Sequence, residues 1–425
     1  MNELPSDPFE RLESEVRSYC RAFPTVFSKA RGAFLYDEQG REYLDFFAGA
    51  GTLNYGHNHP AIKQAVLDYL EADGVVHSLD MMTIAKRAFL EAFETDILGP
   101  RGLDYKVQFT GPTGTNAVEA ALKLARKVKQ RSNIIAFTNA YHGLSAGALA
   151  ATGNRHFRGE AFVTRLNVSF MPFDGYMGGA IDTLAYLRQC LADNSSGVDV
   201  PAAIIVETIQ AEGGINVAEP EWLQGLAAVC RDYDILLIVD DIQVGNGRTG
   251  TFFSFEPAGI RPDMVVLSKS IGGLGLPMSV LLIDRKIDLW KPAEHTGTFR
   301  GNNLAFVAAT AALAFWRTDE FATAVRRKGE ILAGLLRDVQ ARHPGHRLQV
   351  RGRGLIQGLE MPRPELAKAV SREAFRQGII IELAGPNDEV LKCLPPLVIE
   401  ESDLRRGIAT LGQIIDAVLP GTAAD

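Results

Sequence analysis

Lys269 is the residue whose type and position most directly suggest chemistry. It follows the apolar run Met264–Leu267 and one serine, which places it just beyond an expected strand. In an open α/β sheet, ligands bind beyond the carboxyl ends of the strands. An amine that is partly desolvated there has a lowered pKa and can form a Schiff base with an aldehyde. The alternative is a lysine that extends from a strand end into water, and the glycines of a phosphate loop do not precede it.

Asp240 follows the apolar run Ile235–Val239, and Asp241 adds a second carboxylate. A buried acid at a strand end needs a partner or a proton. A pyridinium nitrogen would be a suitable partner, because an acid that keeps such a nitrogen protonated makes the ring an electron sink. A structural pair with an arginine such as Arg248 is the alternative. No histidine lies at ligand spacing here, and the histidines of GHNHP lack a nearby acid or cysteine, so we expect no metal site.

Two further segments offer an anion site and an aromatic ring. GPTGTNAVEAALKLARK opens a helix whose first amides, with the Thr115 hydroxyl, suit a phosphate, although such openings also serve as plain caps. Tyr141, with His142 and Gly143, follows the apolar run Ile134–Phe137 and could stack on a planar ring or simply border the core. These groups could converge on one crevice, where a phosphorylated pyridine aldehyde would use all of them.

The elements that must position these residues alternate between short apolar runs and helical patterns. The runs are continuous, as strands buried on both faces should be: Ile134–Phe137, Ala202–Val206, Ile235–Val239, Met264–Leu267 and Val280–Ile283. An amphipathic helix is expected at Glu219–Tyr233. The alternation predicts an α/β fold with a mainly parallel central sheet.

The two ends of the chain combine helices with short strands. Helices are expected at Glu320–Val339, Glu365–Gln377 and Asp403–Val418, and strands at Leu348–Val350, Gly354–Glu360 and Ile379–Ile381. We therefore expect a small α+β domain built from residues 1–60 and 311–425, around a large cofactor-binding domain of residues 61–310.

The composition restricts the class of protein. The 425 residues are 46% hydrophobic and 22% charged with a net charge of −7, which excludes a wholly disordered chain and disfavours nucleic acid as a partner. Four scattered cysteines indicate free thiols in a reducing compartment, the cytoplasm. The N-terminus has no secretory signal pattern. The apolar stretch Leu304–Trp316 is shorter than the ~20 residues of a membrane span, so we expect a buried helix and no membrane contact.

Eight motifs in order resemble the class III aminotransferases, the ornithine and 4-aminobutyrate type, from about residue 23 to 418. They are GHNHP, TGPTGTNAVEAALKLAR, NAYHG, VETIQAEGG, LLIVDDIQVGNGRTG, VVLSKSIGGLGLP, GTFRGNN and RGRGLIQGLE. DFFAGAGTLNYGHN and VDDIQVGNGRTGTFFSFE further resemble the diaminobutyrate–2-oxoglutarate aminotransferases of ectoine biosynthesis. The resemblance implies the pyridoxal-phosphate-dependent transferase type I fold with pyridoxal 5'-phosphate as cofactor. It also implies ping-pong transfer from L-glutamate to L-aspartate 4-semialdehyde, giving L-2,4-diaminobutyrate and 2-oxoglutarate.

The resemblance also implies roles for individual residues. Lys269 would form the Schiff base and move the proton, Asp240 would bind the pyridine nitrogen, and Tyr141 would stack on the ring. The remaining implied cofactor contacts are Gly114, Thr115, His142, Gln243, Glu207 as the support of Gln243, and Thr298. Thr298 would reach the phosphate in the neighbouring subunit, which implies a homodimer or higher homo-oligomer with shared active sites.

Three positions depart from the pattern of many relatives and bear on the substrate. Lys392 stands where relatives keep an arginine that pairs with the glutamate of the EGG motif, here Glu212. A lysine offers a point charge instead of a bidentate fork. Leu144 stands where relatives often have an arginine, and Arg300 is a candidate second contact for a substrate carboxylate.

Other functions are compatible with the same residues. Another class III omega-aminotransferase, an aminomutase, a racemase or a decarboxylating transaminase could act on a different diamine or amino acid. A nucleotide-binding Rossmann-type protein would use GPTGTN as its phosphate turn, but that turn lacks the GxGxxG spacing. The pairing of Lys269 with Asp240 disfavours a non-catalytic assembly protein of the same fold.

Overall fold

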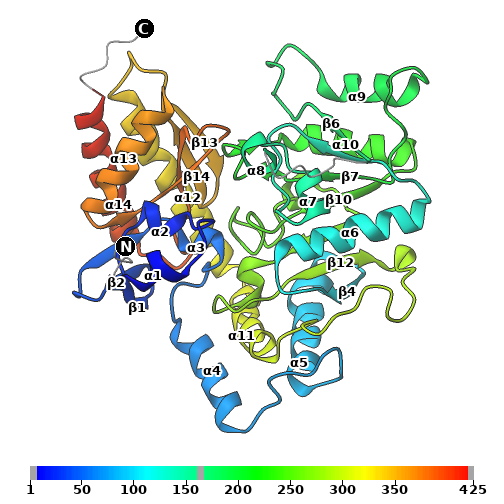
Figure 1. The fold of residues 1–425 in the computed structure, drawn as a ribbon, viewed down its shortest axis with the longest axis horizontal. Helices are drawn as coiled ribbons and strands as arrows, with labels where there is room; N and C mark the ends of the chain where they lie inside the picture. The colour runs from blue at the N-terminus through cyan, green and yellow to red at the C-terminus, as the bar shows by residue number, and fades with distance from the viewer. Residues whose placement is uncertain (1–6, 160–166, 420–425) are drawn as a thin grey trace, which may run out of the picture.

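The computed structural model describes residues 7–159 and 167–419, and a seven-stranded sheet forms the centre of its larger part (Figure 1). The strand order is β4-β12-β11-β10-β7-β5-β6. The strands are β4 (Tyr105–Phe109), β5 (Ile134–Phe137), β6 (Val168–Met171), β7 (Ala203–Val206), β10 (Leu236–Asp240), β11 (Met264–Leu267) and β12 (Val280–Asp284). Neighbouring strands from β11 to β6 are parallel, and only β12 runs antiparallel to both its neighbours. The predicted mainly parallel sheet is confirmed.

Helices cover both faces of this sheet because its strands are apolar on both faces. Leu237 and Val239 of β10 lie in one core cluster with Trp222 of α10 (Pro220–Asp232). Ile238, between them, lies in the opposite cluster with Ala121 of α6 (Gly114–Lys129). Successive side chains of a strand point to opposite faces, so a continuous apolar run is what this layering requires.

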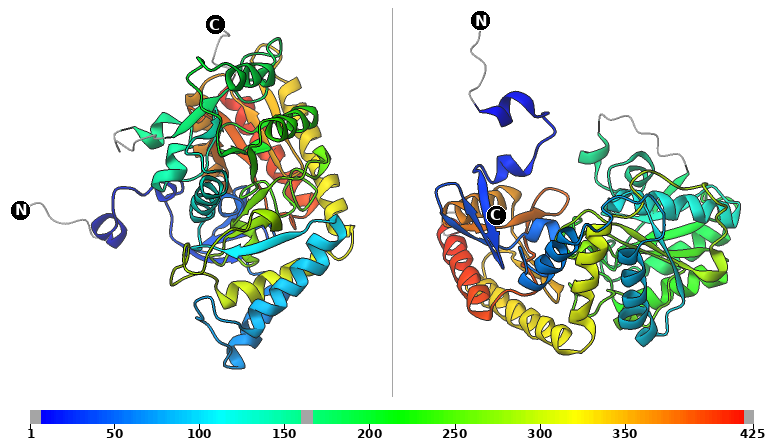
Figure 2. Two further views of the ribbon diagram at one scale, coloured as in Figure 1. Left: turned by 90° about the vertical axis from the view of Figure 1, so that its right-hand side faces the viewer. Right: turned by 90° about the horizontal axis from the view of Figure 1, so that it is seen from below.

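The second part of the molecule joins both ends of the chain in one sheet (Figure 2). Its sheets have the orders β1-β2-β3-β15 and β13-β14-β17-β16, and β15 pairs in parallel with β3. The strands are β1 (Phe27–Arg31), β2 (Phe34–Asp37), β3 (Glu42–Asp45), β13 (Gln349–Arg353), β14 (Ile356–Glu360), β15 (Ile379–Ile380), β16 (Glu382–Ala384) and β17 (Val390–Cys393). This pairing supports our division into domains at residues 60 and 310, which stays a proposal.

Three helices pack on these smaller sheets and enclose a second core. They are α12 (Glu320–Ala341), α13 (Pro364–Arg376) and α14 (Glu401–Val418). Apolar residues at helical spacing, such as Leu404, Ile408 and Leu411 of α14, lie in one core cluster with Phe46. The predicted helices at the C-terminal end are therefore present within a few residues of their expected bounds.

The structure contains further helices and short strands. They are α1 (Pro8–Leu12), α2 (Tyr19–Ala22), α3 (Ala48–Gly51), α4 (Pro60–Glu71), α5 (Ile84–Ala92), α7 (Ala146–Ala150), α8 (Arg155–Arg158), β8 (Ile209–Gln210), α9 (Thr183–Ala192), β9 (Asn216–Val217) and α11 (Asn303–Leu313). The expected buried helix is α11, which packs against α4 and α5. Among residues 7–159 and 167–419, no helix is long and apolar enough to cross a membrane.

Candidate active site

Lys269 lies where the sequence places it, immediately beyond β11 and at the start of a 3-10 turn. Its backbone is left-handed, with φ +52°, a conformation that costs energy for a residue with a side chain. Its Nζ donates a hydrogen bond to the Ala50 carbonyl at 2.9 Å, so the turn formed by α3 closes over the lysine. Burial lowers the pKa of Lys269, and the charge of Glu212 opposes this effect. The site is thus built from both parts of the molecule.

Asp240 ends β10, the strand next to β11, and its carboxylate is buried. Its Oδ2 is 2.7 Å from Nδ1 of His142, whose Nε2 is buried without a hydrogen-bond partner among the described residues. Arg248, the arginine considered as a structural partner, donates instead to the Leu355 carbonyl and to the side chain of Asn54. Asp240 is therefore held by a histidine and not by an arginine.

Glu207 does not support Gln243, as the resemblance implies, but contacts the backbone of Tyr141. It follows β7, which neighbours β5, and its Oε1 accepts a hydrogen bond from the backbone N–H of Tyr141 at 2.8 Å. Gln243 is supported by Glu212 instead, with Nε2 to Oε1 at 2.9 Å, and by the Ala50 carbonyl at 3.0 Å. Because β5 and β7 are adjacent, Glu207 reaches the chain that leaves β5 and fixes the backbone of Tyr141. Burial, and then the charge of Asp240, raises the pKa of Glu207.

The start of α6 forms a narrow cradle. The hydroxyls of Thr115 and Ser145 are 2.6 Å apart, and Ser145 was not anticipated from the sequence. A Cβ on Gly114 would lie 2.7 Å from Ile242 Cδ1, and a Cβ on Gly143 would lie 2.5 Å from Thr115 Oγ1. Gly143 also has φ +122°, which favours glycine. The two glycines thus allow Ile242 and Thr115 to pack closely at the helix start, where backbone amides and the hydroxyls of Thr115 and Ser145 come together, as an anion site requires.

Lys392 and Glu212 form the ion pair that the resemblance implies, with Nζ and Oε1 2.8 Å apart. Lys392 is fully buried, and its Nζ is also 2.9 Å from Oε2 of Glu382. Burial opposes ionisation of Glu212, but the charges of Lys392 and Lys269 bring its pKa down to about 2. For Lys392, the two carboxylates outweigh burial and raise its pKa. Glu382 was not anticipated, because only the pairing of β16 with β17 sets it beside Lys392.

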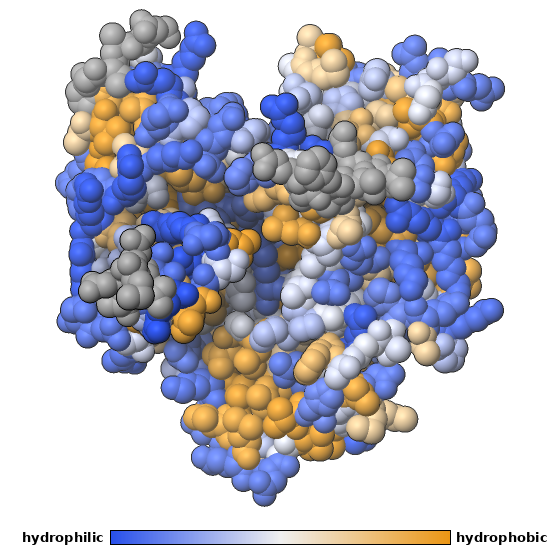
Figure 3. Space-filling view, in the orientation of Figure 1, coloured by the Kyte–Doolittle hydropathy of each residue, from blue (hydrophilic) through white to orange (hydrophobic). Residues whose placement is uncertain are grey.

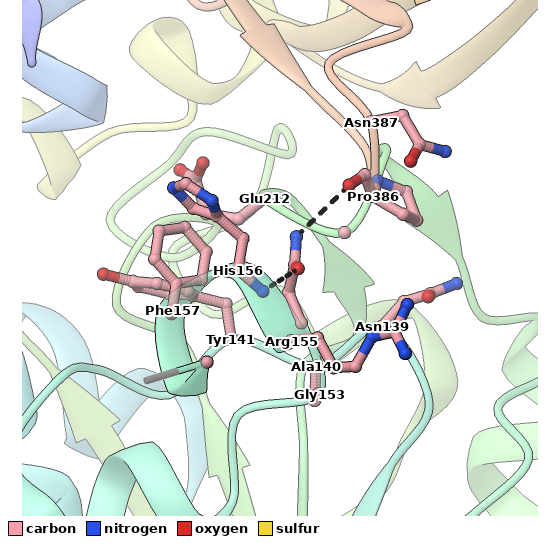
Figure 4. Close-up of a pocket in the computed structure, with 13 residues that line it drawn as sticks. Asn139, Ala140, Tyr141, Gly153, Arg155, His156, Phe157, Glu212, Pro386 and Asn387 are labelled. Atoms are coloured by element: carbon pink, nitrogen blue, oxygen red, sulfur yellow. Dashed lines mark hydrogen bonds between the residues drawn. The ribbon is translucent and has the colours of Figure 1, made fainter. Parts of the chain in front are cut away.

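A cavity of about 700 Å³ opens beside these groups (Figure 4). Tyr141 and Glu212 line it together with Phe157 and His156 of α8 and with Pro386. The rings of Tyr141 and Phe157 meet edge to face, with centroids 5.3 Å apart. Burial, with the charge of Glu212 in second place, raises the pKa of Tyr141 to about 12, so its phenol stays protonated. Of the site residues, Tyr141 and Glu212 therefore face this cavity.

Thr298 and Arg300 lie apart from this cluster within one chain. Thr298 is exposed, and its carbonyl is 3.0 Å from Nε2 of His77. Arg300 donates to the Thr296 carbonyl at 3.1 Å, and its Nε and Nη1 are buried without a hydrogen-bond partner among the described residues. An exposed Thr298 is what a contact with a neighbouring subunit requires, whereas the carboxylate role of Arg300 stays a prediction.

A partly buried lysine just beyond one strand and a buried acid at the end of the adjacent parallel strand, near the start of α6, indicate a class of enzyme, and comparison with known proteins agrees. The chain belongs to the class III aminotransferases, because the family model "Aminotransferase class-III" matches residues 17–415. A diaminobutyrate–2-oxoglutarate transaminase of Wolinella succinogenes is 61% identical over 411 residues, 97% of this chain and 96% of that protein. One of Bordetella parapertussis is 58% identical and covers 94% and 92%. The crystal structure of ornithine aminotransferase from Toxoplasma gondii matches with a TM-score of 0.84 at 28% identity, over 97% of this chain and 94% of that one.

Class III aminotransferases depend on pyridoxal phosphate, and the residues present fit this cofactor. The cradle at Gly114 and Thr115 would hold its phosphate, and Asp240 would meet its ring nitrogen. Lys269 offers a partly buried amine with a lowered pKa for its aldehyde. The unpartnered Nε2 of buried His142 agrees with a cavity that a bound group completes.

Proposed function

We propose that this chain transfers the amino group of L-glutamate to L-aspartate 4-semialdehyde, forming L-2,4-diaminobutyrate and 2-oxoglutarate in a ping-pong reaction. The observation that carries the proposal is the 61% identity, over nearly the whole chain, to a relative named diaminobutyrate–2-oxoglutarate transaminase. A lysine and two carboxylates at the substrate end of the site support it, because both a carboxylate and an ammonium group must be accepted there.

Each site residue has a task that follows from its position. When bound, pyridoxal phosphate supplies a pyridine ring that accepts the electron pair left on the substrate carbon. Asp240 would keep the ring nitrogen protonated, and His142 orients the carboxylate. Lys269 would take the proton from the substrate carbon and return it, and its lowered pKa leaves more of the amine neutral near neutral pH. Tyr141, fixed by Glu207 through its backbone, would cover the ring.

At the substrate end of the site, the ion pair between Glu212 and Lys392 would be closed with one substrate and open with the other. With diaminobutyrate, Glu212 would stay near Lys392 and its charge would favour the ammonium group of the substrate. With glutamate, Glu212 would move away so that Lys392 could donate to a carboxylate. Glu212 lines the cavity while Lys392 is fully buried, so Glu212 is the partner with room to move.

The proposal is tested by measuring both products. The enzyme loaded with pyridoxal phosphate is mixed with L-glutamate and aspartate 4-semialdehyde, and diaminobutyrate and 2-oxoglutarate are quantified. Equal amounts of the two products, with parallel lines in double-reciprocal plots, are expected. If another amino acceptor, such as glutamate 5-semialdehyde, is used at least as well, the chain is a class III aminotransferase of different specificity.

We infer further that the chain acts as a homodimer. Apolar side chains are exposed on the loop before α5, where Met82 is 99% exposed and Ile84 at the helix start is 68% exposed. Figure 3 shows apolar side chains gathered over the lower part of the molecule, where α4 and α5 lie. His77 of this loop contacts the ring of Phe299, next to the exposed Thr298. Burying this surface against a second copy would bring Thr298 of each chain toward its neighbour.

The reducing cytoplasm suits this enzyme. Its four cysteines form no disulfide, and Cys20 is exposed as a free thiol. Unpaired exposed thiols persist where glutathione and thioredoxin keep them reduced.

A further inference from the structure

Lys392 has two carboxylate partners that reach it from different parts of the molecule. Glu382 lies directly opposite Lys392 in the pairing of β16 with β17, so this partner belongs to the same sheet. Glu212 lies between β8 and β9, and besides Lys392 it binds the Nε2 of Gln243. A partner across an antiparallel pair is held at short range by the backbone ladder. Glu382 is therefore the fixed partner of Lys392, and Glu212 is the one beside the cavity.

Glu382 is itself positioned by a third element. The hydroxyl of Tyr19, in α2, donates a hydrogen bond to its Oε1 at 3.0 Å. The other carboxylate oxygen lies 2.9 Å from Nζ of Lys392 as an ion pair, although among the described residues it accepts no hydrogen bond. Glu382 is also buried and does not line the cavity, in contrast to Glu212. Its geometry is thus set independently of any substrate.

The charges of this group are unbalanced. One ammonium, Lys392, faces the two carboxylates of Glu212 and Glu382. The charge of Lys269 also acts on both carboxylates, and once the amine of Lys269 is joined to the cofactor one negative charge is left in excess. A buried cation that loses its only partner raises the free energy of the protein. In a site with a single ion pair, the lysine would therefore attract a substrate carboxylate strongly once that pair opened. Here Lys392 stays paired with Glu382 when Glu212 moves. An incoming carboxylate then meets a neutralised lysine, whereas an ammonium group, for which Glu212 stays in place, meets net negative charge.

We propose that Glu382 is a positioning residue that sets the substrate preference of this site, by keeping Lys392 neutralised so that the diamine is favoured over the dicarboxylate. This inference rests on the proposed function, because it assumes that diaminobutyrate and glutamate are the two amino donors. It assigns no contact between Glu382 and the substrate. Glu382 acts through Lys392.

The test compares the two half-reactions of the holoenzyme in the variants Glu382→Gln and Tyr19→Phe. Each half-reaction is followed by stopped-flow absorbance with L-2,4-diaminobutyrate or L-glutamate as the only substrate. For Glu382→Gln we expect kcat/KM for diaminobutyrate to fall about tenfold, mainly through KM, while that for glutamate holds or rises. Tyr19→Phe should shift the ratio in the same direction by a smaller factor. The control is Glu360→Gln, which removes a carboxylate paired with Arg351 in the same sheet.

The outcomes separate this inference from the proposed function. Wild-type enzyme that reacts with glutamate but not with diaminobutyrate overturns the proposed function, and this inference falls with it. Wild-type enzyme that reacts with both, with an unchanged ratio in Glu382→Gln, overturns the inference alone. An equal loss in both half-reactions also overturns it, because a merely structural role would affect the two substrates alike. Retained cofactor absorbance and an unchanged melting temperature show that each variant is folded.

Discussion

At the scale of single residues, Lys269 and Asp240 have separable tasks. Lys269 is a partly buried amine whose pKa is lowered chiefly by burial, and Asp240 is a buried carboxylate held by His142. Replacing Lys269 by Ala removes the only group proposed to move the proton, so transamination should fall to background. The measurement is product formation by the purified variant at saturating pyridoxal phosphate. Turnover within tenfold of wild type would remove Lys269 from this role.

Asp240→Asn should cost on the order of a thousandfold in rate, about 4 kcal/mol, because an amide cannot keep a ring nitrogen protonated. Single-turnover kinetics with glutamate would measure this loss. Asp241→Asn is the matched control, because Asp241 accepts from the backbone of Ser254 instead of facing His142. A near-normal rate for Asp240→Asn would contradict its role.

The sequence was sufficient to predict site residues that come directly after a strand in the same motif. It was not sufficient to predict residues that reach the site only through contacts with distant segments. Lys269, Asp240 and Tyr141 each follow an apolar run, so position within the motif located them. Glu382 and Ser145 join the site through strand register and a side-chain hydrogen bond with distant segments. No local sequence pattern marks such residues. For the same reason, the sequence did not identify Glu212 as the residue that supports Gln243.

At the scale of elements, the turn after β10 contains a buried acid that should make stability depend on pH. The Oδ2 of Asp241 accepts from the backbone N–H of Ser254 at 3.0 Å, and burial raises the pKa of Asp241 from 3.8 to about 7. The folded state therefore binds this proton more tightly than the unfolded state. The resulting stabilisation is complete below the unfolded pKa and is lost as the pH rises through about 7.

Asp241→Asn should remove this dependence. Between about pH 5 and about pH 8, the free energy of unfolding of the variant should gain about 3 kcal/mol relative to wild type, because roughly two pKa units are involved. Urea titrations of both proteins at the two pH values would measure the difference. An equal pH dependence in the two proteins would show that Asp241 does not carry this proton.

The elements themselves were largely predictable because their patterns are local. Continuous apolar runs located the five central strands, and helical spacing located α10, α12, α13 and α14. The antiparallel direction of β12 was not predictable, because its run is as apolar as those of the parallel strands β10 and β11. Direction depends on the connection between strands, which periodicity does not encode.

At the scale of the whole molecule, the proposed homodimer would complete each active site with Thr298 of the second chain. The double substitution Met82→Lys and Ile84→Lys places charges on the exposed apolar surface before and at the start of α5. We expect the variant to sediment as a monomer and to lose activity, because the partner subunit's Thr298 would no longer reach the phosphate. Analytical ultracentrifugation gives the mass. The matched control is Ile181→Lys, an exposed apolar residue just before α9. A fully active variant that remains dimeric would place the interface elsewhere.

The role of Lys269 and the proposed substrate are tested most directly by the visible absorbance of the protein loaded with pyridoxal phosphate, before and after addition of L-2,4-diaminobutyrate. We expect a yellow protein whose visible band is lost with this amine and restored by 2-oxoglutarate. A yellow protein that ignores diaminobutyrate but is bleached by another amine would contradict the proposed substrate. A protein that never becomes yellow would contradict the role of Lys269 and the arrangement of the site around it.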